Sequence, residues 1–156
     1  MPPLPSELSQ NKPLIRPATN EDLEQAYAFL EPFFAEKLLL RRSPPELAIL
    51  LPTGFIALAT DETSGSPGHV VGFCSVEIYS KKLSEIQCLA VHQDFRRHGV
   101  GGQLVDCCVS LAKERGVMEV MAISSSESFL QNHGFDYSLP QQKRALFYQI
   151  RNRFDD

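Results

Sequence analysis

The stretch FRRHGVGGQLV, residues 95–105, places two arginines and a histidine directly before three glycines. The apolar run CLAVHQD leads into it, and a segment with helical periodicity begins at Val100. Where a strand enters a helix through glycines, the first backbone N–H groups of the helix lack an internal partner and point outward. The helix dipole adds partial positive charge, so such a junction binds phosphate groups. A tight turn without a ligand is the alternative, and the flanking Arg96, Arg97 and His98 favour the anion site.

The segments around this junction predict one domain of strands and helices. Apolar runs of strand length, bounded by turn residues, predict six strands at 14–18, 54–60, 69–80, 85–91, 117–123 and 144–150. Helical periodicity and capping residues predict helices after Thr19, after the loop 41–45, from Val100 to Gly116 and over 127–135. Pro32 is expected to end or kink the first helix. A strand, a crossover helix and a strand over 85–123 predict a parallel pair inside an otherwise antiparallel sheet.

The composition is that of an ordinary globular chain. Its 156 residues are 43% hydrophobic and 22% charged, which predicts a single domain, at 13–156. The proline-rich start predicts a flexible arm at 1–12. A net charge of -4 disfavours a general nucleic-acid or membrane-surface binder. The four cysteines have no metal-ligand spacing, so no metal is expected. The start shows no signal peptide and no run has membrane-spanning length, so a cytoplasmic protein is expected.

The basic residues gather in pairs on this acidic chain, which suggests local anion sites. Solvated surface is the alternative for any single pair. The pairs are Arg41 and Arg42, Lys81 and Lys82, Arg96 and Arg97, Lys143 and Arg144, and Arg151 and Arg153.

Two sequence motifs, about 30 residues apart, resemble those of a known family. RRHGVG, 96–101, is similar to the acetyl-CoA motif Q/R-x-x-G-x-G/A of the GNAT superfamily of N-acetyltransferases, and FLQNHGF, 129–135, resembles its downstream F-Y-x-x-x-G-F segment. The resemblance implies the GNAT fold, an α/β (α+β) architecture. Its mixed, mostly antiparallel sheet would have about six to seven strands, splayed between the fourth and fifth, with about four helices.

The resemblance also implies acetyl-CoA as co-substrate. Backbone groups of Leu89, Ala90 and Val91 would hold the pantetheine. The pyrophosphate would lie on the loop formed by Arg96, Arg97, His98, Gly99, Val100 and Gly101. A substrate amine would then attack the thioester directly, which requires proton removal from the amine and a donor for the developing oxyanion.

One residue departs from the common family motif, and the sequence resembles a subgroup that shares this departure. Leu130 stands where many relatives have the Tyr that protonates the leaving thiolate. The segments LLLRRSPPEL, KLSEIQCLAVHQDFR and KRALFYQIR resemble the acetyltransferase domain of bacterial N-acetylglutamate synthase, which also lacks that Tyr. This resemblance implies that Glu85 is the general base, with Cys88 and Ser124 assisting at the carbonyl oxygen or the leaving sulfur. It also implies that the carboxylates of glutamate face Arg42, Lys82, Arg144 and Arg151.

Each of these roles has a simpler alternative. By strand alternation Glu85 falls on the opposite face from Cys88, so a bulge between them would be needed to bring both to one site. Cys88 is otherwise a packed core thiol, and Ser124 a capping hydroxyl for the next helix. Arg151 is otherwise a solvated charge.

The function predicted from these observations is acetylation of the α-amine of L-glutamate, the first step of arginine biosynthesis. The alternatives are acetylation of another small amine or amino acid, or a CoA-binding regulatory module without turnover. Dimerisation is common in the family, and no feature of this sequence decides it.

Overall fold

A five-stranded sheet forms the centre of the computed structural model, which describes residue 4 and residues 12–60, 68–137 and 146–151. The strand order is β1-β2-β3-β4-β5. All neighbours pair antiparallel except β4 and β5, which are parallel. The predicted α/β class and mixed sheet are confirmed, although the described strands number five rather than six to seven. The strands are β1 (Leu14–Pro17), β2 (Gly54–Ala59), β3 (His69–Ile78), β4 (Leu83–Val91) and β5 (Glu119–Met121).

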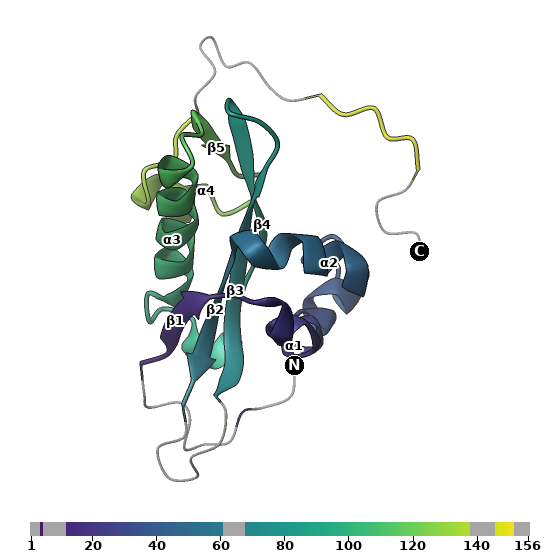
Figure 1. Ribbon diagram of the computed structural model, residues 1–156, viewed down its shortest axis with the longest axis vertical. Coiled ribbons are helices and arrows are strands. Elements are labelled where there is room, and N and C mark those ends of the chain that lie inside the picture. Colours follow the sequence, from purple (N-terminus) through teal and green to yellow (C-terminus); the bar gives the residue numbers. More distant parts are fainter. Residues whose placement is uncertain (1–3, 5–11, 61–67, 138–145, 152–156) are drawn as a thin grey trace.

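Helices cover both faces of this sheet (Figure 1). One face packs against α1 (Leu23–Ala35) and α2 (Pro44–Leu50), and the other against α3 (Val100–Glu114), beside which lies α4 (Glu127–Asn132). The buried apolar residues accordingly form two layers, as expected when a sheet is apolar on both faces. Within the described ranges, no helix is long and apolar enough to cross a membrane.

Pro32 does not end α1, although an end at this residue was one of the two outcomes expected from its missing N–H. The helix continues to Ala35 and closes with hydrogen bonds from Glu36 N–H to the Pro32 carbonyl (3.0 Å) and from Lys37 N–H to the Phe34 carbonyl (3.1 Å). The last turn buries Phe33 and Phe34 in the core. Their packing offsets the hydrogen bond that proline cannot make.

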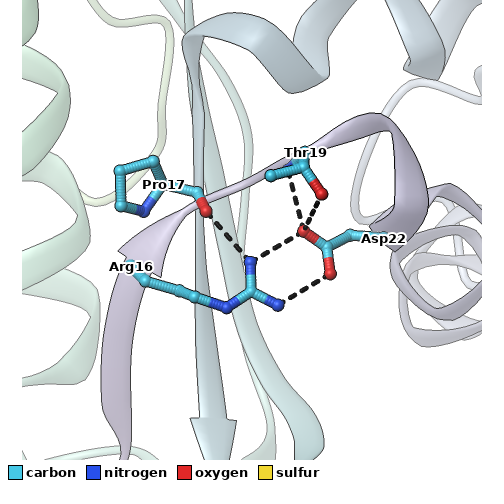
Figure 2. A network of polar contacts seen from close by, with 4 residues as sticks. All are labelled: Arg16, Pro17, Thr19 and Asp22. Carbon is cyan, nitrogen blue, oxygen red and sulfur yellow. Dashed lines mark hydrogen bonds and ion pairs between the residues drawn. The ribbon is translucent and has the colours of Figure 1, made fainter.

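The end of β1 is tied to the start of α1 by one carboxylate (Figure 2). Asp22 accepts two hydrogen bonds of 2.8 Å from the Arg16 guanidinium and a third, also 2.8 Å, from the Thr19 backbone N–H. Hydrogen bonding from Arg16 lowers the pKa of Asp22 to about 2. Thr19 therefore acts as the predicted cap, but it caps a 3₁₀ turn at Asn20–Asp22 that precedes α1.

The strand predicted at 144–150 is wrong for the part that the structure describes. Residues 146–150 form no strand, and Leu146, Tyr148 and Ile150 are 93%, 90% and 86% exposed. Residues 146–151, yellow in Figure 1, run apart from the sheet. Apolar alternation supplies β propensity, but a strand is stable only beside a neighbour that pairs its backbone groups. Arg144 and most of the arm 1–12 lie outside the described residues.

Candidate active site

A β-bulge interrupts β4 at Cys88. Phe73 and Ser75 of β3 are two positions apart. Their partners on β4, Ala90 and Gln87, are three positions apart, so β4 carries one extra residue. Cys88 adopts a φ of 55°, in the left-handed region that non-glycine residues rarely occupy. The extra residue reverses the alternation. Glu85 and Cys88 therefore both lie on the face that α1 and α2 cover. The bulge that a shared site requires is thus present.

A series of hydrogen bonds joins five side chains on this face. Arg42, in the loop before α2, donates to Gln87 Oε1 (2.8 Å). Gln87 Nε2 donates to Glu77 Oε2 (3.2 Å) and to the Tyr79 hydroxyl (3.3 Å). The Tyr79 hydroxyl donates to Glu85 Oε2 (2.5 Å). We refer to these five residues as the β3–β4 polar network.

Two groups at this site are neutral proton donors near neutral pH. Partial burial, and then the hydrogen bond to Glu85, raise the pKa of the Tyr79 hydroxyl, a residue that is 51% exposed, above its usual value. Burial also raises the pKa of the Cys88 thiol to about 11, although the nearby Arg42 charge acts in the opposite direction. Cys88 is thus suited to donate from S–H and unsuited to act as a thiolate nucleophile.

The glycine-containing loop has the local geometry expected of an anion-binding helix start. Gly99 adopts a φ of 77° and immediately precedes α3, whose first residue is Val100. Arg97 is also left-handed, with a φ of 67°, and Arg96 Nε donates to the Val91 carbonyl (3.4 Å). The first amides of a helix have no partner within it, so this loop offers N–H groups beside positive side chains.

The edge of β4 that faces β5 is only partly paired. Parallel pairing joins Leu83–Glu85 to Glu119–Met121, and in the described part of the chain it goes no further. From residue 86 to Val91, this edge of β4 has no strand beside it among the described strands. The predicted splay between the fourth and fifth strands is therefore seen, and Leu89, Ala90 and Val91 lie within it.

The third glycine of the stretch serves a packing contact. A Cβ atom on Gly102 would lie 2.3 Å from a ring carbon of His133, so a larger residue here would require the His133 ring to move. The His133 ring is tilted by 48° against Phe129, with centroids 5.0 Å apart, and its Nδ1 lies 3.2 Å from Asp106 Oδ1. Gly102 therefore leaves room for the His133 ring beside the first turn of α3.

The structure describes three of the four basic residues predicted to hold the acceptor. Arg42 belongs to the β3–β4 polar network, and both Arg42 and Arg151 help to lower the pKa of Glu46, after its hydrogen bonds with Ser43. Lys82 is exposed in the turn between β3 and β4. Arg144 lies outside the described residues.

Ser124 and Leu130 lie on either side of the start of α4. The Ser124 hydroxyl accepts a hydrogen bond from the Ser126 backbone N–H (2.9 Å) in the turn before α4, and Ser126 rather than Ser124 occupies the N-cap position of that helix. Leu130 is buried at 8% exposure and packs as an apolar residue. Neither residue is joined by a described hydrogen bond to the polar network.

Three members of the polar network, Glu77, Tyr79 and Gln87, were not predicted from the sequence. The signal was present, because Glu77 and Tyr79 are separated by two positions at the end of an apolar strand, as are Glu85 and Gln87. Residues at that spacing share a face of a strand. The hairpin register, which places Glu77 opposite Glu85, was needed to bring the pairs together.

The chain is similar to known acetyltransferases. Residues 17–135 match the acetyltransferase (GNAT) family. An uncharacterized N-acetyltransferase of Chlorobaculum tepidum is 29% identical over 121 residues, covering 78% of this chain and 74% of that protein. The amino-acid acetyltransferase of Edwardsiella ictaluri is 28% identical over 145 residues, covering 89% of this chain. This chain spans 32% of that enzyme's length.

A solved structure has the same fold. N-acetylglutamate synthase from Neisseria gonorrhoeae, complexed with coenzyme A and N-acetyl-glutamate, superposes with a TM-score of 0.64 at 24% identity. The match covers 79% of this chain and 28% of the synthase.

Proposed function

The chain belongs to the acetyltransferase (GNAT) family and is an acetyl-CoA-dependent N-acetyltransferase, and we propose that its acceptor is the α-amine of L-glutamate. The product would be N-acetylglutamate, the first intermediate of arginine biosynthesis. The name of the Edwardsiella enzyme and the ligand of the Neisseria synthase support this choice.

The residues present fit acetyl-CoA. The loop from Arg96 to Gly101 would hold the pyrophosphate through the first amides of α3 and the flanking cations. The backbone of Leu89, Ala90 and Val91, on the partly unpaired edge of β4, would hold the pantetheine. When bound, acetyl-CoA supplies the acetyl thioester and thus an electrophilic carbonyl carbon.

The residues on the bulged face would handle the protons of a direct transfer. Glu85 accepts the proton that the attacking amine loses, directly or through a water molecule. Cys88 donates from its neutral S–H to the carbonyl oxygen or to the leaving sulfur, and Ser124 assists there. The N–C bond forms as the C–S bond breaks, and the CoA thiolate leaves. No covalent enzyme intermediate is needed.

The cations around this face would select the acceptor. Arg42 enters it through the hydrogen bond to Gln87, and Lys82, Arg144 and Arg151 would complete the recognition of two carboxylates. The observation that carries the proposal is the bulge at Cys88, because it puts the Glu85 carboxylate and the Cys88 thiol on the face where Arg42 bonds Gln87.

The test is steady-state release of CoA thiol by the purified protein with acetyl-CoA and a panel of amino acids, with mass spectrometry of the product. The proposal expects turnover with L-glutamate to exceed turnover with the other acceptors and the product to be N-acetylglutamate. Preferential turnover with another amine would contradict glutamate as the acceptor, while the conclusion that the protein is an N-acetyltransferase would stand.

A further inference from the structure

The Tyr79 side chain joins the two carboxylates of the β3–β4 polar network. Its hydroxyl lies 2.5 Å from Glu85 Oε2 and 3.3 Å from Glu77 Oε2. A phenol carries a single proton, so it can donate to one of them at a time. The shorter separation identifies Glu85 as the acceptor, in a charge-assisted hydrogen bond.

Gln87 fixes this direction of donation. Its amide nitrogen lies 3.2 Å from Glu77 Oε2 and 3.3 Å from the Tyr79 oxygen, and an amide nitrogen can only donate. Glu77 is thereby supplied with its own donor, and the Tyr79 oxygen serves as an acceptor on that side. The Tyr79 proton is left to point at Glu85.

We propose that Tyr79 is a positioning residue for Glu85, an inference that rests on the proposed role of Glu85 as general base. The hydroxyl holds Oε2, so that Oε1, which has no hydrogen bond among the described residues, is the oxygen presented to the acceptor amine. The Tyr79 backbone is itself fixed, because its N–H bonds the Leu83 carbonyl across the hairpin (3.1 Å). The bond also reduces the repulsion that like charges directly opposite one another, at Glu77 and Glu85, would otherwise create.

The test is a double-mutant cycle of Tyr79→Phe and Glu85→Gln, measured as kcat and KM for both substrates. Tyr79→Phe removes only the hydroxyl, and it should lower kcat by about tenfold while leaving the acetyl-CoA KM unchanged. In the Glu85→Gln background the same change should lower kcat no further, because Tyr79 acts only through that carboxylate. Tyr27→Phe, which removes a hydroxyl from α1, is the matched control and should match the wild type.

A second readout separates positioning from general stability. Acceptors whose amine is already unprotonated at the assay pH need less help from a base, so Tyr79→Phe should slow them less than it slows an ordinary amino acid. A purely structural defect would slow both equally.

The outcomes separate the inference from the proposed function. Wild-type kcat in Tyr79→Phe, with an impaired Glu85→Gln, would overturn the positioning role alone. Independent, multiplicative losses in the double variant would overturn it as well. Full activity of Glu85→Gln would overturn the general-base assignment and, with it, this inference.

Discussion

Glu85 and Cys88, three positions apart on β4, present their side chains to the same face of the sheet. Strict alternation would separate them, and the single extra residue between Gln87 and Ala90 reverses it. Arg42 reaches this face from the loop before α2 and bonds Gln87. The bulge thus puts a carboxylate and a neutral thiol on one face, and the loop before α2 brings a guanidinium to the same face.

The left-handed backbone at Cys88 predicts an unusual order of stability for two small replacements. In an ordinary strand, glycine is less stable than alanine by about 0.5–1 kcal/mol. At a φ of 55° the order should reverse, with Cys88→Gly more stable than Cys88→Ala by about 1 kcal/mol, because alanine keeps the steric cost of its Cβ. Urea unfolding of the two variants measures the difference. A more stable Cys88→Ala would show that the backbone is not left-handed there.

Adjacent arginines provide a matched pair for testing acceptor recognition. Arg42 bonds Gln87 in the polar network, whereas Arg41 pairs with Glu31 on α1 (3.0 Å). Arg42→Ala should raise the KM for glutamate about tenfold or more while sparing acetyl-CoA affinity, because a lost carboxylate contact weakens acceptor binding. Arg41→Ala should leave both constants near the wild type. Lys82→Ala should resemble Arg42→Ala, and equal effects on both substrates would remove these residues from the acceptor site.

Neighbouring glycines of α3 should respond differently to alanine. A Cβ on Gly102 would overlap the His133 ring at 2.3 Å, whereas one on Gly101 would lie 3.5 Å from Val91, an ordinary contact. Gly102→Ala should therefore be less stable than Gly101→Ala by about 1–3 kcal/mol, because both variants gain the same helix propensity and only the first creates the overlap. Combining Gly102→Ala with His133→Ala should recover part of the loss, because the overlapping ring is gone. Thermal and denaturant unfolding report both effects.

The carboxylate at the start of α1 predicts acid sensitivity. The folded-state pKa of Asp22, about 2, lies below the ordinary Asp value of about 3.9. Its contribution to stability is therefore full above that ordinary value and is lost as the pH falls through 2. Asp22→Asn should cost about 2 kcal/mol at pH 7, and this difference from the wild type should shrink as the pH falls below about 4. A difference independent of pH would contradict the ionised network of Figure 2.

Local sequence patterns predicted most of the elements but not the feature that organises the site. Glycine at 99 and at 116 signals a left-handed position, and both residues adopt one. Nothing about a cysteine signals the positive φ at Cys88, since that backbone is imposed by pairing with β3. The alternation of side chains along the strand showed that a bulge would be needed. Only the pairing register of β3 and β4 showed that it is present.

Side-chain contacts between neighbouring strands also could not be predicted from local sequence patterns. Tyr79 lies next to Glu85 only because the hairpin pairs Glu77 with Glu85. At the other extreme, the apolar alternation near Tyr148 predicted a strand that residues 146–150 do not form, because propensity does not supply a pairing partner.

The glutamate assignment is tested most directly by comparing kcat/KM for L-glutamate with that for L-glutamine at saturating acetyl-CoA. The two acceptors have nearly the same shape and differ by one negative charge, so the comparison isolates recognition of the side-chain carboxylate. We predict a preference for glutamate of about tenfold or more, reduced in Arg42→Ala but kept in Arg41→Ala. Equal or better use of glutamine by the wild type would contradict a dicarboxylate acceptor site.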